Sequence, residues 1–343
     1  MEKDNSMRSI LTIALLLLAL SVSGFGQTLI NGAGATFPYP IYSKWFDEFH
    51  KLHPDAQINY QSIGSGGGIR QLTDGTVDFV ASDMPMNDEQ LAKQKVPVLH
   101  FPTVLGGVVP TYNIPGVSAE LNFTQEALAG IFLGTVKKWN DPAIAKANPG
   151  VKLPGDDIVV VHRSDGSGTT FIWTDFLCKV SPEWKTATSG ANTSVKWPVG
   201  LGAKGNEGVA GLVKSTPGSL GYVELIYAIQ NKMPYGRVRN SSGTFVKAEL
   251  ASVTAAAAAA ATNMPDDFRV SITNAPGKAA YPISSFTWLL VPTKIHDATK
   301  QKDLVEFLHW MLGPGQKLTE ALAYAQLPKN VAAKEVKAIS KIQ

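Results

Sequence analysis

The sequence predicts an α/β protein built from two domains. Runs typical of strands alternate with runs typical of amphipathic helices along the chain, and this alternation favours a mixed α/β fold. The chain has 343 residues, enough for a leader and two domains of about 100–200 residues each. Three times, a strand-like run ends in Gly with Ser or Thr and then gives way to a helix.

Residues 1–26 are expected to form a secretory signal peptide. A short charged start precedes an apolar run from Ile10 to Leu20, and cleavage is expected after Gly26. The alternative is a single membrane anchor, but the apolar run is shorter than the ~20 residues that a span needs. No cysteine lies near the leader. We therefore expect a periplasmic protein that is not anchored by lipid.

The composition excludes several classes of function. The formal net charge is only +3 and Lys and Arg form no run, which argues against a nucleic-acid partner. Cys178 is the only cysteine, so no internal disulfide can form. The six histidines are scattered and no His-Glu-x-x-His motif occurs. We expect no metal and no cofactor.

In the first third of the chain, helices and strands alternate. The segment IYSKWFDEFHKLHP places its apolar residues at helical spacing and ends at Pro54. NDEQLAKQ should start a helix with Asn87 as its cap. The other expected elements are a strand in AQINYQSIG (56–64), a short helix in GIRQLTDG (68–75) and a strand in VDFVASD (77–83).

Two apolar segments predict strands that cross between the domains: TVLGGVVPTYNI (103–114) and YPISSFTWLLVP (281–292). Between them, TQEALAGIFLG predicts a helix closed by Gly134. Residues 197–224 predict a loop, a helix and a turn into a strand, and residues 303–322 a helix broken at 313–315. The alanine run 255–261 is assigned no function.

The three glycine-containing turns are NGAGATFPYP, IGSGGGIRQL and SDGSGTTFIW, each before an expected helix. Such a turn offers unpaired backbone N–H groups, a hydroxyl and the positive end of a helix dipole. One such turn is common at helix starts for structural reasons alone, because a Ser or Thr cap beside Gly is frequent. Three in one chain favour a shared anion site.

Other chemistries fit these turns less well. A nucleophile elbow requires Gly-x-Ser-x-Gly, and the glycines directly flanking Ser65 and Ser167 do not provide it. His162 and Asp165 lie near Ser167, so a triad stays open as an alternative. The phosphate-binding loop of nucleotide-binding enzymes and the dinucleotide fingerprint are both missing from the sequence.

Three charged residues fit a bound anion. Arg163 offers a planar fork that grips two oxygens, and Asp165 can orient it. Asp83 ends a strand-like run. A carboxylate beside an anion makes sense when the anion carries a proton, as HPO4²⁻ and H2PO4⁻ do and sulfate at neutral pH does not. Each also has an ordinary structural interpretation: Arg163 would form a surface or structural ion pair, Asp165 an Asx turn into the glycine, and Asp83 would be a turn residue or a helix cap.

Taken together, NGAGATFPYPIYSKW, IGSGGGIRQL, VDFVASDMPM, HRSDGSGTTF and WPVGLGAKGNEGV…PGSLGYVE resemble, in this order, the phosphate-binding proteins (PstS family) of high-affinity phosphate ABC transporters. The resemblance extends from about Ile30 to residues 324–331. It implies a type II periplasmic binding protein fold, with two α/β lobes joined by a two-strand hinge. The expected lobes are 27–104 plus 283–343 and 105–282.

The resemblance also implies the site residues by position. The phosphate-binding residues would be Ala35, Thr36, Phe37, Ser65, Asp83, Arg163, Ser167, Gly168 and Thr169, with Asp165 supporting Arg163. Asp83 would accept the phosphate proton. This chain departs from many relatives at Gly66, where they have a second serine, and that leaves the rigidity of the turn open.

The implied function is high-affinity binding of inorganic phosphate and its delivery to the membrane permease subunits of an ABC transporter. We expect a monomer that is not an enzyme. The alternatives are a binding protein for arsenate, sulfate or molybdate, and a hydrolase or phosphatase that uses the same cleft.

Overall fold

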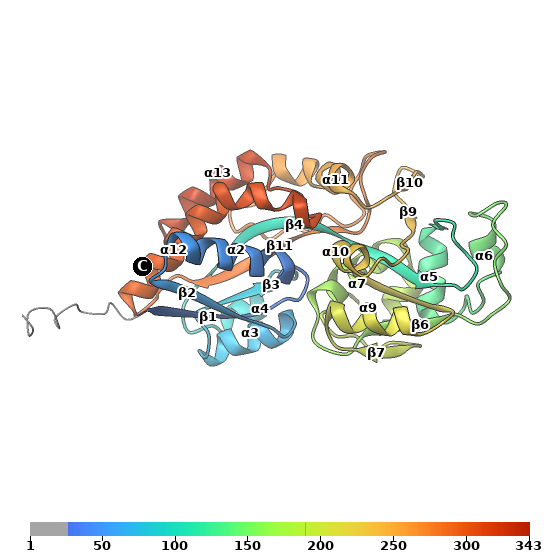
Figure 1. The fold of residues 1–343 in the computed structure, drawn as a ribbon, viewed down its shortest axis with the longest axis horizontal. Helices are drawn as coiled ribbons and strands as arrows, with labels where there is room; N and C mark the ends of the chain where they lie inside the picture. Colours follow the sequence, from blue (N-terminus) through green and yellow to red (C-terminus); the bar gives the residue numbers. More distant parts are fainter. Residues whose placement is uncertain (1–26, 189) are drawn as a thin grey trace, which may run out of the picture.

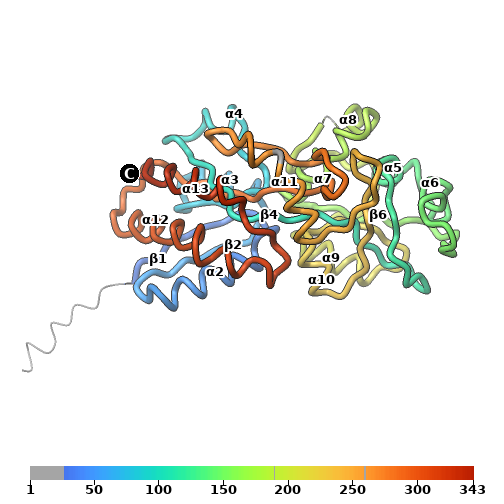
Figure 2. Tube along the Cα trace, turned by 90° about the horizontal axis from the view of Figure 1, so that it is seen from above, coloured from blue at the N-terminus to red at the C-terminus, as the bar shows by residue number. Residues whose placement is uncertain are grey.

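The computed structural model describes residues 27–188 and 190–343 (Figure 1). The predicted signal peptide lies outside the described residues. The described chain forms two α/β halves that lie side by side, and the view from above in Figure 2 shows both halves next to each other. One eight-stranded sheet runs through both, in the order β2-β1-β3-β11-β4-β8-β6-β7.

The first half contains both ends of the described chain. Its parallel strands are β1 (Thr28–Gly34), β2 (Ala56–Ser62) and β3 (Phe79–Ser82), and β11 (Ser284–Pro292) pairs antiparallel with β3. Its helices are α2 (Tyr39–Leu52), α3 (Ser65–Asp74), α4 (Asp88–Ala92), α12 (Ala298–Leu312) and α13 (Lys329–Ile339), with 3-10 turns at Pro314–Leu318 and Glu320–Leu322.

In the second half, parallel strands and helices again alternate. Its strands in the large sheet are β6 (Val159–Arg163), β7 (Leu201–Ala203) and β8 (Ser219–Glu224), and a small sheet contains β5 (Asn122–Phe123), β9 (Arg237–Arg239) and β10 (Phe245–Val246). Its helices are α5 (Gln125–Leu133), α6 (Pro142–Ala145), α7 (Gly168–Val180), α8 (Pro182–Thr188), α9 (Gly205–Ser215) and α10 (Leu225–Gln230).

The strand β4 (Val98–Asn113) connects the two halves. Its first part, residues 98–107, pairs with β11, and its last part, residues 108–113, pairs with β8. Both segments that the sequence predicts as crossovers are therefore strands, and the predicted α/β class is confirmed. The helix predicted at residues 303–322 ends at Leu312 and continues as a 3-10 turn, as the Gly-Pro-Gly sequence indicates.

The alanine run lies in α11 (Leu250–Thr262), which packs against β4 and β11 and contacts α13. Figure 1 shows α11 beside α13, at the top of the molecule. Asn330 of α13 donates a hydrogen bond to the Ala261 carbonyl. The predicted lobe boundaries, 27–104 plus 283–343 and 105–282, remain a proposal, and α11, which falls within 105–282, packs against β11 and α13 of the first half as well as against β4.

Each half has its own aromatic core. In the first, Phe46 contacts Phe79 of β3 and Phe307 of α12. In the second, the Trp173 ring stacks on Tyr222 with centroids 5.1 Å apart. Of the helices in residues 27–188 and 190–343, none combines the length and the apolar character that crossing a bilayer requires.

Candidate functional site

The three glycine-containing turns meet where the two halves face each other. The first follows β1, the second opens α3 and the third opens α7, so each lies at the carboxyl end of a strand. This is where ligands bind in open α/β sheets. The turns are in contact across the cleft, because Gly66 N–H of the second donates to the Gly166 carbonyl of the third at 2.9 Å.

Two buried charged groups each keep one atom without a hydrogen-bond partner among the described residues. Asp83 is 1% exposed, and its Oδ2 has no partner, whereas its Oδ1 accepts from the Thr287 hydroxyl at 2.7 Å. Arg163 is 3% exposed, and its Nη1 has none. A buried polar group without a partner costs about 1–3 kcal/mol, and a charged one costs more. One acceptor and one donor are therefore available to a ligand.

The guanidinium of Arg163 is held rigidly. Its Nε donates to Asp165 Oδ1 at 2.7 Å and its Nη2 to Asp165 Oδ2 at 2.5 Å. Burial acts to raise the pKa of the Asp165 carboxyl, but the hydrogen bonds and charge of Arg163 outweigh it, so that pKa lies below its usual value. Asp165 also accepts from Gly205 N–H at 3.1 Å. The pair orients the remaining Nη1 of Arg163.

Burial dominates the electrostatics of Asp83. It raises the pKa of this carboxyl to about 7, against the lowering effects of the Thr287 hydroxyl and the Arg163 charge. Desolvation disfavours the ionised form of a carboxyl group. An anion that carries a proton would restore a partner to the ionised Asp83.

Backbone N–H groups at the turns are available to a ligand. The N–H groups of five residues make no hydrogen bond with another described residue: Thr36, Phe37, Ser65, Gly168 and Thr169. The last three open helices, where N–H groups have no intrahelical acceptor. The Ala35 N–H is not available to an anion, because it donates to the Ala81 carbonyl at 2.9 Å, and the Ser167 N–H is likewise paired with the Thr193 carbonyl at 2.8 Å.

Four predicted hydroxyl groups act as acceptors in their bonds to the protein. Ser65 Oγ accepts from Asp83 N–H at 3.2 Å, and Ser167 Oγ caps α7 by accepting from Thr170 N–H at 3.0 Å. The hydroxyl groups of Thr36 and Thr169 both accept from Asn206 Nδ2, at 2.7 and 3.0 Å. Each hydroxyl hydrogen can therefore be donated to an anion.

The position of Gly168 shows how tightly these groups converge. A Cβ atom added at Gly168 would lie 2.4 Å from both Asp83 Oδ2 and Ser65 Oγ. Only glycine allows this approach. Gly168 of the second half thus closely approaches Asp83 and Ser65 of the first half.

Several residues at the site were not predicted from the sequence. Asn206 bridges the two halves, and Thr287 holds Asp83. Tyr227 and Tyr324 donate to the carbonyls of Thr36 and Phe37, both at 2.6 Å. All four lie outside the three turns: Asn206 in α9, Tyr227 in α10, Thr287 in β11 and Tyr324 after the second 3-10 turn. The residues around Asn206 read locally as a helix start, so nothing in them points to a contact with Thr36.

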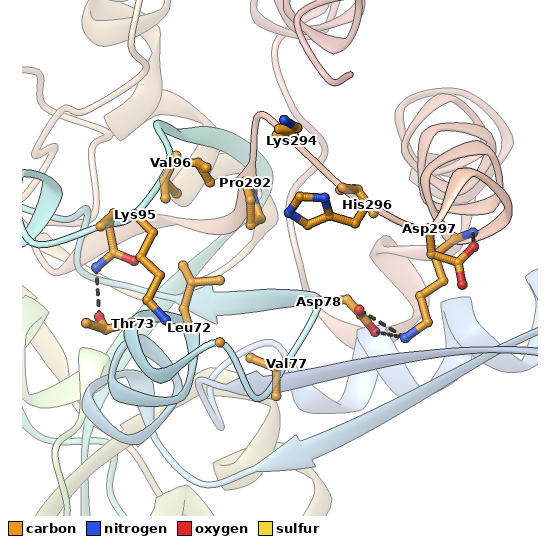
Figure 3. A pocket seen from close by; sticks show the side chains of 15 residues that line it. Leu72, Thr73, Val77, Asp78, Lys95, Val96, Pro292, Lys294, His296 and Asp297 are labelled. Carbon is orange, nitrogen blue, oxygen red and sulfur yellow. Dashed lines mark hydrogen bonds and ion pairs between the residues drawn. The ribbon is translucent and has the colours of Figure 1, made fainter.

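Two hollows lie outside this group of residues. One, of about 510 Å³, lies between the halves and is lined by Met84, Pro85 and Phe171 among others. Met84 directly follows Asp83 in the sequence. Another, of about 380 Å³, lies on the first half (Figure 3). There Asp78 is paired with Lys300 at 3.0 Å. We place the site at the turns, because a buried acceptor, Asp83 Oδ2, and a buried charged donor, Arg163 Nη1, both lack partners there.

Comparisons with known proteins agree with this arrangement. Residues 21–314 match the model of a periplasmic-binding-protein (PBP) superfamily domain. The chain is 46% identical over 324 residues to the phosphate-binding protein PstS of Pasteurella multocida, with 93% of each chain covered. It is 46% identical over 303 residues to PstS of Xylella fastidiosa (strain Temecula1), covering 88% of this chain and 82% of that one. A solved phosphate-binding protein from Stenotrophomonas maltophilia has the same fold, with a TM-score of 0.70, 20% identity and 90% and 93% of the two chains covered.

Proposed function

Because this chain belongs to the family of PstS phosphate-binding proteins, we propose that it binds inorganic phosphate with high affinity and delivers it to an ABC transporter. Its fold is the two-lobed periplasmic binding protein fold of that family. The proposed ligand site consists of the turns around Thr36, Ser65 and Ser167, together with Asp83 and Arg163.

The single observation that supports this proposal best is the pair of buried atoms without partners, Asp83 Oδ2 and Arg163 Nη1. One is an acceptor and the other a charged donor. A monoprotonated phosphate satisfies both, because its oxygens accept from the guanidinium and its hydroxyl donates to the carboxylate. The N–H and O–H donors of the three turns would satisfy its remaining oxygens.

The same pair favours phosphate over sulfate. Fully ionised sulfate has no hydrogen to donate, so it would leave Asp83 buried beside a second anion. A site built to bind a hydrogen-bond donor rejects a ligand that lacks it, and the discrimination should be at least ~100-fold. Arsenate has the same pattern of protonation as phosphate and satisfies the same groups.

A hydrolase in the same cleft finds less support. His162 Nδ1 pairs with the Arg163 carbonyl at 3.0 Å, and its ring stacks on Trp197. Ser167 Oγ caps its own helix. A serine nucleophile needs a base within hydrogen-bond reach, and the hydrogen bonds of the described residues pair neither Ser65 nor Ser167 with a histidine. We therefore propose a binding protein without catalytic residues.

Location and partners are part of this proposal. We propose that the protein acts in the periplasm as a monomer, after export by its leader, and that its partners are phosphate and the membrane permease subunits of the transporter. The mild net charge of +3 supports a partner other than nucleic acid.

Calorimetric titration of phosphate-stripped protein tests the proposed function. Phosphate should bind tightly with one-to-one stoichiometry, and sulfate should give no heat under the same conditions at neutral pH. Equal binding of both anions would contradict the role of Asp83. Absence of phosphate binding by folded, stripped protein would overturn the proposed function, and turnover of a phosphomonoester would favour the hydrolase.

A further inference from the structure

Asn206 is a buried amide group that connects the two lobes at the proposed site. It lies in the first turn of α9 and is 0% exposed. Its Nδ2 donates to Thr36 Oγ1 of the first lobe at 2.7 Å and to Thr169 Oγ1 of the second at 3.0 Å. Its own backbone N–H also donates to Thr36 Oγ1, at 3.3 Å.

The orientation of the Asn206 amide group follows from its third contact. Its Oδ1 accepts from the backbone N–H of Glu224 at 2.9 Å. A backbone N–H can only donate, so the amide oxygen must face Glu224. The two hydrogens of the NH2 group must then face the two threonine hydroxyl groups.

This orientation determines how both hydroxyl groups are used. Thr36 Oγ1 receives two donors, which occupy both of its lone pairs. Thr169 Oγ1 receives one from the same amide. In the hydrogen bonds between described residues, neither threonine hydroxyl donates. Each O–H hydrogen is therefore left for the site between the lobes.

We propose that Asn206 is a positioning residue that sets both threonine hydroxyl groups as donors to the bound anion. This proposal rests on the proposed function, and it adds a residue from outside the three turns. By the same contacts, Asn206 makes donation from Thr36 of one lobe and Thr169 of the other depend on lobe closure. An anion with several acceptor oxygens is the ligand class that such an arrangement favours.

The test replaces the NH2 donor of Asn206 with a carboxylate oxygen, which can only accept. In Asn206→Asp, one carboxylate oxygen can still accept from Glu224 N–H, but the other can only accept. The threonine hydroxyl groups would then donate to Asp and not to the ligand. Phosphate affinity measured by calorimetry should fall at least ~100-fold, through the loss of two hydrogen bonds and the added negative charge.

Asn148→Asp is the matched control. Asn148 is also buried in the second lobe, its Oδ1 accepts from Asn122 N–H, and its Nδ2 donates twice, to the carbonyls of Asn122 and Ile144. The substitution makes the same chemical change away from the site. It should lower the melting temperature and leave phosphate affinity within about twofold of the wild type.

A second measurement separates the loss of the Asn206 hydrogen-bond donor from a general disturbance of the structure. Thr36→Val should weaken phosphate binding ~2–10-fold in the wild type, but it should cost almost nothing in Asn206→Asp, where that hydroxyl no longer serves the ligand. If Asn206→Asp fails to fold, the same cycle in Asn206→Ala should show a smaller effect of Thr36→Val than the wild type does.

The outcomes distinguish the two proposals. If wild-type protein does not bind phosphate, the proposed function fails. If the wild type binds phosphate but Asn206→Asp binds as tightly as Asn148→Asp, or the effect of Thr36→Val is the same in every background, the role of Asn206 is overturned.

Discussion

At the scale of single residues, the proposed site depends on the chemistry of one carboxyl group. Asp83 is buried, is held at Oδ1 by Thr287 and lacks a partner at Oδ2 within the described part of the chain. Replacing it with Asn should keep the contact to Thr287 and supply a donor at the second position. The selectivity for phosphate over sulfate should then fall by at least about tenfold, because sulfate can accept from the new NH2 group.

Competition between phosphate and sulfate in calorimetry measures this change. Asp78→Asn is the control, since Asp78 is a partly buried carboxylate of the first lobe that pairs with Lys300 away from the turns. An unaltered preference in Asp83→Asn would show that this carboxyl does not face the ligand.

The raised pKa of Asp83 also predicts a pH dependence of stability. The pKa is about 7 in the folded protein, against an ordinary value of 3.8. Between these values the folded state holds a proton that the unfolded state has lost, so the contribution of Asp83 to stability decreases as the pH rises through this window. In phosphate-free buffer, Asp83→Asn should gain unfolding free energy relative to the wild type between about pH 4 and pH 7, by up to ~4 kcal/mol where the lobes are closed and by less where an open cleft lets water reach this carboxyl group.

Urea unfolding at several pH values tests this prediction. The comparison with the wild type isolates Asp83, because Glu224 and Glu335, whose pKa values burial also raises, are present in both proteins. Parallel stability curves for the two proteins would contradict the prediction.

At the scale of secondary-structure elements, the start of α7 has two roles. Ser167 Oγ caps the helix by accepting from Thr170 N–H, and its O–H is proposed to donate to phosphate. Ser167→Ala should therefore lower stability by ~1 kcal/mol and weaken phosphate binding by ~0.5–1.5 kcal/mol. Thr124→Ala removes the equivalent cap of α5, where Thr124 Oγ1 accepts from Ala127 N–H.

Thermal unfolding and calorimetry of both variants separate the roles. Loss of either cap should lower stability by a similar amount, and only Ser167→Ala should weaken phosphate binding. If the two variants bind phosphate equally well, the hydroxyl of Ser167 serves only the helix.

The elements also show how much the sequence could predict. Turn chemistry is local, so Gly, Ser and Thr alone indicate helices near the starts of α2, α3 and α7, although α3 begins at Ser65, three residues before the predicted Gly68. Asn87 is the predicted N-cap of α4, and the structure adds the bond from Asn87 N–H to Gln90 Oε1 that completes a capping box. Ala35 stays a predicted site residue, but its N–H pairs with the Ala81 carbonyl, a contact that depends on sheet register and that local sequence does not show. Asn206, Thr287 and Tyr324 reach the site from distant segments, and no local pattern marks such contacts.

At the scale of the whole molecule, the two lobes meet through polar contacts at the site. Gly66 N–H bonds to the Gly166 carbonyl, and both Asn206 and Tyr227 bond to Thr36. The chain also passes between the lobes in the long strand β4 and in the segment that leads into β11, and away from the site Arg269 of the predicted second lobe pairs with Asp88 of the first at 2.7 Å. Closing the cleft buries Arg163 Nη1, Asp83 Oδ2 and five N–H groups, and each group left without a partner costs about 1–3 kcal/mol.

This cost predicts that phosphate controls closure. Without an anion, an open arrangement that lets water reach these groups should dominate, and phosphate should shift the population to the closed one, because only the closed lobes supply donors from both sides. Small-angle X-ray scattering of stripped protein should show a smaller radius of gyration after phosphate is added. Arg163→Ala loses the charged donor, so the same phosphate concentration should compact it less. If calorimetry shows that phosphate saturates the wild type while its radius of gyration stays constant, the lobes are already closed without ligand, and the buried donors must be satisfied by water.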